Sequence, residues 1–267
     1  MGMSKRVKAL IENAYGNSVS IGRAAKRQRV LDLIARLRPL DSDRGLVRIG
    51  PADDGGYLMP DDLDGVKTAI SPGVSTESRF DEALAGRGID VYMLDASVDG
   101  PSIQHPRFHF EKKFLGPVTG GQYVTMADFC ARVPGFDTGD DLVLQMDIEG
   151  AEYPVIAGMT PELLSRFRII ILEVHGLENL FHEFSFDLMA GVFEKLLDNH
   201  AVVHLHPNNC CGVAVSQGIE IPRVLELTLY RRDRAKFTAN VNRVYPHALD
   251  ADNVPGNPSI VLPPCWR

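Results

Sequence analysis

Residues 144–158 read LQMDIEGAEYPVIAG, and this stretch decides the fold. An apolar run ends at Asp147, Glu149 and Gly150 follow, and a small residue, Ala151, begins a helical stretch. In an α/β protein this pattern places a carboxylate at the carboxyl edge of a parallel sheet, where open sheets bind ligands. The question of function is therefore what Asp147 and Glu149 face.

The segments on either side of this stretch alternate between strand and helix. Short apolar runs typical of buried strands lie at residues 66–71, 89–95, 108–114, 141–147, 167–175 and 201–207. Helical spacing lies at 78–87, 126–132, 153–159 and 186–197. Residues 223–232 alternate as a final antiparallel strand would, and we expect this strand at the sheet edge. The pattern predicts a doubly wound α/β sheet.

The first 45 residues have a different texture from the rest. Residues 5–15 and 23–37 have helical spacing, and Arg38-Pro39 ends the second helix. We therefore predict an N-terminal helical cap at 1–45 and one main domain at 46–267. The helices could cover the active site or form a homodimer contact.

The composition excludes several classes of protein. A chain of 267 residues, 45% of them hydrophobic, can bury one substantial core. Its 35 acidic and 28 basic residues give a net charge of -7, which argues against nonspecific binding of nucleic acid or anionic membranes. Four cysteines without CxxC spacing, no apolar signal core and no membrane span indicate a cytoplasmic protein with reduced thiols.

A first candidate site follows the strand at 66–71. Gly73 can let a ligand approach the backbone, and Ser75 precedes a helix with free N–H groups. Asp95 ends the next strand, where an acid can bind both ribose hydroxyls. Because the GxGxxG fingerprint is absent, a nucleoside without a pyrophosphate, such as S-adenosylmethionine, fits better than NAD. The alternative is that Gly73 is only a turn and Asp95 a surface acid.

The turn Asp53-Asp54-Gly55-Gly56-Tyr57 also has two interpretations. Asp54 or the amides of Gly55 and Gly56 could hold the amino or carboxylate end of the cofactor, with Tyr57 covering it. Alternatively, the segment is only a hairpin turn, for which Asp-Gly is a strong signal.

At this point the residues resemble a known family. DIEGAEYPVIAG (147–158) resembles the DxEGxExxVLxG signature of FkbM-type S-adenosylmethionine-dependent methyltransferases. RIGPADDGGY (48–57) and SPGVSTESRFDEALAGRGIDVYMLD (71–95) resemble a bacterial subgroup linked to methylation of sugars and surface polysaccharides. The resemblance covers roughly residues 46–210. It implies a class I methyltransferase fold, a Rossmann-like sheet of about seven strands with the last antiparallel, and methyl transfer, usually to a hydroxyl oxygen.

The resemblance also assigns cofactor residues. It places Ser71, Gly73 and Val74 along the methionine part of S-adenosylmethionine, Asp95 at the ribose, and Asp128 near the adenine. We also expect Asp147 to contact the cofactor, because it faces the reacting centre. The family often has Glu-Pro where this chain has Asp95-Ala96, so the adenine contacts of Ala96 and Ser97 depart from the pattern.

The remaining strand ends carry the chemistry. A sugar hydroxyl needs a base, a metal or both to attack a methyl group. His175 is the best candidate base because an imidazole titrates near neutrality, and Asp147 or Glu149 could orient it or hold the substrate. Alternatively, Asp147 and Glu173 could bind Mg²⁺ with His206 completing the shell, and an imidazole ligand would favour Mn²⁺. Each histidine could instead be a satisfied polar group, and Glu149 and Glu152 could simply complement the dipole of the following helix.

We therefore predict an S-adenosylmethionine-dependent O-methyltransferase that acts on a sugar of a surface polysaccharide or its nucleotide-linked precursor. The alternatives are a methyltransferase of a small natural product, or a nucleoside-binding protein without catalysis. A nicotinamide oxidoreductase is disfavoured by the missing glycine fingerprint.

Overall fold

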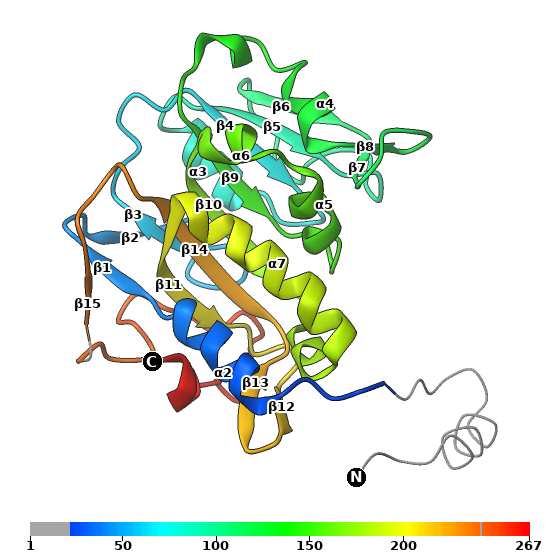
Figure 1. Cartoon of the computed structure of the whole chain (residues 1–267). Helices are drawn as coiled ribbons and strands as arrows, with labels where there is room; N and C mark the ends of the chain where they lie inside the picture. The colour runs from blue at the N-terminus through cyan, green and yellow to red at the C-terminus, as the bar shows by residue number, and fades with distance from the viewer. Residues whose placement is uncertain (1–21, 241) are drawn as a thin grey trace.

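The computed structural model describes residues 22–240 and 242–267, so the helix predicted at 5–15 lies outside the described residues. Within this part, a seven-stranded sheet has the order β11-β14-β10-β9-β4-β5-β6 (Figure 1). Its strands are β4 (Thr68–Pro72), β5 (Asp90–Leu94), β6 (Phe108–Glu111), β9 (Leu142–Met146), β10 (Phe167–Val174), β11 (His200–Pro207) and β14 (Leu225–Arg231). The neighbours are parallel except that β14 is antiparallel to both β10 and β11. This is the predicted class I methyltransferase sheet with its last strand antiparallel.

The last strand was expected at the sheet edge, and this position is wrong. β14 lies between β10 and β11, and its residues are buried except for the last, Arg231. The alternation in LELTLYR arises because Glu226 and Thr228 face a buried polar region, and not because one face of the strand meets solvent. Thr228, for example, donates from its hydroxyl to the carbonyl of Leu58 at 2.7 Å.

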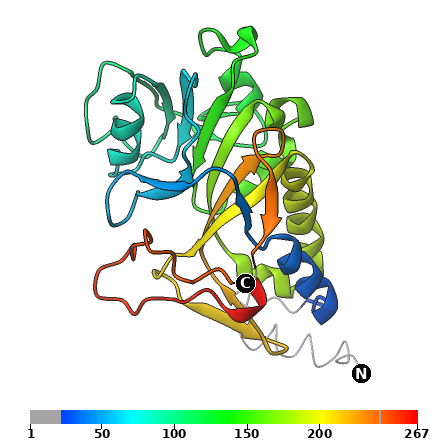
Figure 2. The ribbon, with the colours of Figure 1, turned by 90° about the vertical axis from the view of Figure 1, so that its left-hand side faces the viewer.

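Helices and a hairpin cover the two faces of the sheet (Figure 2). One face packs against α2 (Arg27–Arg36), α4 (Met126–Cys130), α5 (Glu152–Gly158), α6 (Pro161–Ser165) and α7 (Glu183–Asn199). The other packs against α3 (Arg79–Ala85) and the hairpin of β2 (Leu46–Ile49) and β3 (Tyr57–Pro60). The turn 53–57 is therefore a hairpin turn, as one of the two interpretations predicted.

The N-terminal segment does not have a core of its own among the described residues. Helix α2 confirms the helix predicted at 23–37, and Val30, Leu33 and Ile34 pack into the same core as the sheet. β1 (Leu40–Ser42) pairs with β15 (Phe237–Ala239), near the other end of the chain. The predicted boundary at residue 45 therefore does not separate two packed units.

Two further segments differ from the sequence prediction. The strand expected at 108–114 leaves the sheet after Glu111, and β7 (Phe114–Leu115) pairs instead with β8 (Tyr123–Val124). The hairpin of β12 (Val213–Ser216) and β13 (Ile219–Pro222) was not predicted. The 3₁₀ helices among the described residues are η2 (Phe136–Thr138), η3 (Leu177–Phe181) and η4 (Pro264–Trp266). None of the described helices has both the length and the apolar character that a membrane span requires.

Candidate active site

The loop after β9 holds Asp147 at the centre of the carboxyl edge, against the end of β4. Gly73 follows β4 with a φ of +89°, a conformation that glycine adopts most easily. A Cβ atom on Gly73 would lie 1.5 Å from the carbonyl oxygen of Asp147. The sequence predicts that a ligand makes this close approach. The structure shows that the backbone of Asp147 makes it, so glycine is needed to bring two strand ends together.

Glu152 shapes the same loop from the first turn of α5. Its side chain is fully buried, and Oε1 accepts the backbone N–H groups of Ile148 at 3.0 Å and Gly150 at 3.2 Å. Glu149 between them has a φ of +55°, which costs a non-glycine residue about 1–2 kcal/mol. The buried carboxylate of Glu152 thus stabilises a strained turn that directs Glu149 out of the strand.

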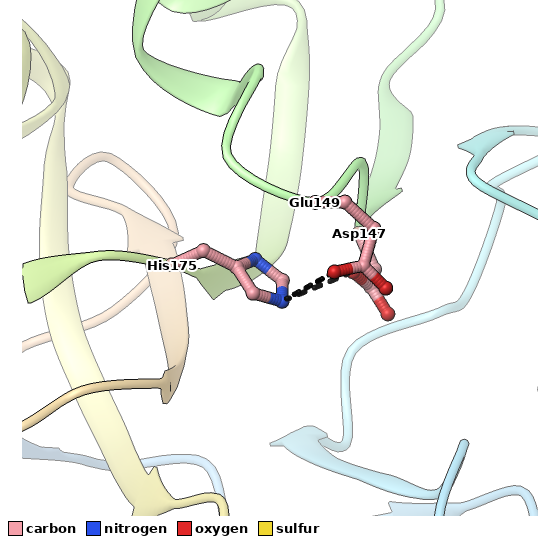
Figure 3. A group of neighbouring side chains, drawn as sticks. All are labelled: Asp147, Glu149 and His175. Carbon is pink, nitrogen blue, oxygen red and sulfur yellow. Dashed lines mark ion pairs between the residues drawn. The ribbon is translucent and has the colours of Figure 1, made fainter. Parts of the chain in front are cut away.

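His175, immediately after β10, faces this loop, and the side chains of Asp147, Glu149 and His175 point toward one another (Figure 3). Its Nε2 lies 3.4 Å from Glu149 Oε2 and 3.9 Å from Asp147 Oδ1, while Nδ1 lies 3.3 Å from Glu152 Oε1. Burial lowers the pKa of His175, but the carboxylate of Glu152 beside Nδ1 and those of Asp147 and Glu149 more than offset this, so the pKa is raised above its usual 6.5. Glu152, rather than Asp147 or Glu149, is therefore placed to orient the imidazole.

Beyond His175, three residues on neighbouring strands form a row of cross-strand pairs along the carboxyl edge of the sheet. Glu173 of β10 pairs with Glu226 of β14, and Glu226 pairs with His206 of β11. We call Glu173, Glu226 and His206 the polar row; each is 5% exposed. Burial raises the pKa of Glu226 to about 6, and burial together with Asp147 and Glu226 raises that of Glu173 well above its usual value. Burial likewise raises the pKa of Asp147 to about 7, although His175 opposes this.

A cavity of about 410 Å³ opens on the other side of Asp147, over the ends of β4, β5 and β9. Five of the predicted cofactor residues line it: Gly73, Ser75, Asp95, Ser97 and Asp147. Its remaining lining residues are Leu94, Phe114, Leu115, Tyr123, Ile148, Glu149 and Ala151. Small-molecule sites are typically concave, largely apolar and of this size.

Asp95 is held rigidly at the cavity wall. Its Oδ1 accepts the backbone N–H and the hydroxyl of Ser97, at 2.7 and 2.6 Å, and its Oδ2 accepts the N–H of Ser75 at 2.9 Å. A carboxylate has about four lone-pair positions, so Oδ2 retains capacity for a ligand hydroxyl. Asp95 is 6% exposed and is therefore not the surface acid of the alternative interpretation.

Five predicted cofactor residues do not line this cavity. They lie in the β2–β3 hairpin, or their side chains point to a part of the sheet away from the cavity. The hydroxyl of Ser71 donates to Gln145 at 3.0 Å, and Val74 is buried in the core beneath the hairpin. Tyr57 is 5% exposed and packs edge-on against Phe80. The turn holding Asp54 and Gly55 is fixed by Arg48, which donates to the carbonyls of Pro51 and Asp53.

Asp128 and Ala96 also lie outside the cavity lining. Asp128 is in the first turn of α4, where its carboxylate accepts the Thr119 hydroxyl and its N–H donates to the Thr125 cap at 3.1 Å. The hydrogen bonds from Thr119 and Thr125 lower its pKa. Asp128 therefore stabilises a local turn, and its role near the adenine stays a prediction.

The set predicted to bind a metal, Asp147, Glu173 and His206, is not the set that the structure brings together. Within the described part of the chain, the residues that can each offer one ligand atom within 4.8 Å of the others are Asp147, Glu149 and His175. His206 instead lies with Nδ1 3.5 Å from Asp250 Oδ2, because β14 separates β11 from β10.

Sequence reasoning missed Glu152 and the apolar side of the cavity. Glu152 was visible as a helix-start acid, but only its burial and its contact with His175 distinguish it from a dipole partner. Phe114 and Tyr123 lie with ring centroids 5.7 Å apart on the β7–β8 pair. The signal was the FHFEKKF segment, in which two lysines interrupt the expected strand.

Comparisons with known proteins bear on the same region. A family model described as the methyltransferase FkbM domain matches residues 99–199, which include Asp147, Glu152 and His175. None of the curated proteins compared with the chain matches it. The match supports a methyltransferase, and with it the use of S-adenosylmethionine.

Solved structures show only distant likenesses. A protein described as a hemolysin, from Streptococcus thermophilus, has 14% identity and a TM-score of 0.36 over 81% of this chain and 70% of its own. A variant of the 16S rRNA (adenine(1408)-N(1))-methyltransferase from Catenulisporales acidiphilia has 11% identity and a TM-score of 0.31 over 72% of this chain and 100% of its own. Likenesses this low add nothing to the fold, which rests on the strand order.

Proposed function

We propose that this protein transfers the methyl group of S-adenosylmethionine to a hydroxyl oxygen of a sugar, in a surface polysaccharide or its nucleotide-linked precursor. The observation that carries the proposal is the position of His175 and Asp147 between a nucleoside-sized cavity and the polar row. The family-model match supports methyl transfer, and the carboxylates, imidazole and amides around the row are groups that hydrogen-bond sugar hydroxyls.

The residues of the cavity suit the proposed cofactor. Asp95 has capacity for a ribose hydroxyl, and Leu94, Phe114 and Tyr123 offer apolar surface for a planar base. Asp147 lies at the end of the cavity nearest His175, where its carboxylate would favour the positive charge of a sulfonium. Bound S-adenosylmethionine would supply an electrophilic methyl group there.

His175 is the proposed base. Its Nε2 would accept the hydroxyl proton while the substrate oxygen bonds to the methyl carbon and the carbon–sulfur bond breaks, leaving S-adenosylhomocysteine and a protonated imidazole. Glu152 stabilises that imidazolium through Nδ1, and fixes the ring so that Nε2 faces the reacting centre. Glu149 would hold the acceptor, since its side chain is 87% exposed beside Nε2.

The proposal places the reaction in the cytoplasm, with a sugar or glycan precursor and no nucleic acid as partner. The net charge of -7 and the free thiols of Cys130, Cys210, Cys211 and Cys265 support these assignments. A homodimer stays a prediction.

Two measurements test the proposal. Calorimetry with S-adenosylhomocysteine should show saturable binding, and no binding by the intact protein would contradict methyl transfer. Labelled S-adenosylmethionine should then transfer its methyl group to one member of a panel of nucleotide sugars. His175→Gln should abolish this turnover and leave the affinity for S-adenosylhomocysteine unchanged; turnover near that of the wild type would remove His175 as the base.

A further inference from the structure

The polar row and the neighbouring Asn253 contain buried polar atoms that have no hydrogen-bond partner among the described residues. Asn253 donates from Nδ2 to Glu226 at 2.7 Å and to Asp54 at 3.1 Å, yet its Oδ1 accepts no hydrogen bond. Nε2 of His206 also has no partner. Both residues are 5% exposed. Since an unsatisfied buried polar atom costs about 1–3 kcal/mol, these atoms indicate a ligand that completes the site.

The charge around the row is also unbalanced. In the described ranges, no lysine or arginine forms an ion pair with Asp54, Asp147, Glu173 or Glu226. Burial raises the pKa of Glu226, and His206, Asn253 and then Arg48 oppose this. The guanidinium of Arg48 hydrogen-bonds backbone carbonyls and pairs with no acid of the group. Glu173 and Glu226 are direct cross-strand partners, an arrangement that is unfavourable for like charges.

The two histidines supply only part of the missing charge, because each also faces an acid outside the group. His175 lies 3.7 Å from Glu173, but its Nδ1 faces the fully buried Glu152. His206 lies against Asp250, with Nδ1 3.5 Å from Oδ2. A buried carboxyl group is stable when it is protonated or when it is paired. The ligand that the ionised carboxylates of the row would bind is therefore a cation.

The geometry favours an organic cation over a metal ion. The described residues whose ligand atoms converge within 4.8 Å are Asp147, Glu149 and His175, and no acid of the polar row belongs to that group. A ligand that spans the row must therefore present several donors at different positions. A protonated amine flanked by hydroxyls on one ring does this.

We propose that the polar row, with Asn253 and Asp54, is the acceptor subsite and binds a protonated amine, so that the acceptor is an amino sugar. Its role as acceptor subsite rests on the proposed function; its preference for an amine does not. The amine would lie between Glu173 and Glu226, and a hydroxyl on the same ring would reach His175.

The test compares two probes that differ in one group, methyl β-D-glucosaminide and methyl β-D-glucoside, by calorimetry with and without S-adenosylhomocysteine. We expect the amine to bind at least about tenfold more tightly, as one charge-assisted contact provides. Glu226→Gln keeps an oxygen for Asn253 and should remove this preference, and Glu173→Gln should do the same. Glu162→Gln, at an exposed position of α6, should leave it intact.

The inference would be overturned by equal affinities for the two probes, or by no binding of either probe up to about 50 mM. It would also be overturned if both glutamine variants melted like the wild type and still preferred the amine. So would tight binding of Mn²⁺ that is lost in Glu226→Gln, since the row would then hold a metal. Failure of the proposed function is distinguishable, because it appears as absent binding of S-adenosylhomocysteine.

Discussion

The contact between Glu152 and His175 gives the most direct prediction. Glu152→Gln removes a negative charge from the imidazole and keeps an oxygen that can accept the N–H groups of Ile148 and Gly150. The loop should therefore keep its shape while the electrostatic environment of His175 changes. The substitution separates the positioning of the base from the folding of the turn.

The expected magnitude follows from the contact between Nδ1 and Oε1, which are 3.3 Å apart. A contact of this kind between a carboxylate and an imidazolium contributes on the order of 1.5–3 kcal/mol. The pKa of His175 is raised in the structure, with Glu152 the main contribution that opposes burial. Glu152→Gln should therefore lower this pKa, since the imidazolium loses the carboxylate that favours it most.

Two assays check this shift. NMR titration of the imidazole, assigned with His175→Gln, measures the pKa without any substrate. Because a base must be neutral to accept a proton, the acidic limb of the turnover–pH profile should also move to lower pH by the same amount, and the weaker base should lower the plateau. An unchanged or higher pKa in Glu152→Gln, with Glu162→Gln as the matched control, would refute the reasoning.

The remaining predictions concern the cofactor, the metal and stability. Gly73→Ala should abolish binding of S-adenosylhomocysteine in calorimetry, since its Cβ would overlap the Asp147 carbonyl. Asp95→Asn should weaken that binding at least about tenfold. Turnover should survive EDTA if His175 acts alone; loss restored by Mn²⁺ would indicate a metal at the Asp147 cluster. Asp250 accepts a hydrogen bond from His204 at 2.8 Å. Burial raises the pKa of Asp250, but His204 and His206 lower it by more, so the net pKa is depressed. The stabilisation from Asp250 is therefore present above its unfolded pKa of about 4 and is lost as the pH falls. Asp250→Asn should therefore destabilise the protein by about 1.5–3 kcal/mol at pH 7, and the difference should narrow in denaturant melts below pH 4.

The sequence could predict what local rules determine. A carboxylate after a buried strand marks the edge of an α/β sheet, so Asp95, Asp147 and His175 were placed at one edge without coordinates. The alternation of strand and helix likewise predicted the sheet, because apolar runs and helical spacing are properties of short segments. These predictions needed no knowledge of which strands are neighbours.

The errors concern properties that depend on neighbouring strands. His206 was grouped with Asp147 because both follow buried runs, but β14 inserts between β11 and β10 and brings His206 opposite Glu226. Ser71 and Asp128 do not line the cavity, and their cofactor roles stay predictions, because a resemblance carries residue types but not the direction of side chains. Glu152 was ambiguous because helix capping and the orientation of a base require the same acid at the same position.

The burial of so many acids along one edge requires a physical reason, because each would be more stable in water. Asp147 joins the two halves of this edge: its backbone closes against Gly73 at the cavity, and its Oδ1, which has no hydrogen-bond partner among the described residues, faces His175. Burial raises the pKa of Asp147 to about 7, so near neutral pH a cation bound beside it would shift the carboxyl group to its ionised form. A sulfonium on one side and an ammonium on the other would each favour the carboxylate, and each would therefore strengthen the binding of the other through Asp147. On this reasoning the acidic edge is unfavourable in the free protein because its charges are arranged for two cationic ligands at once.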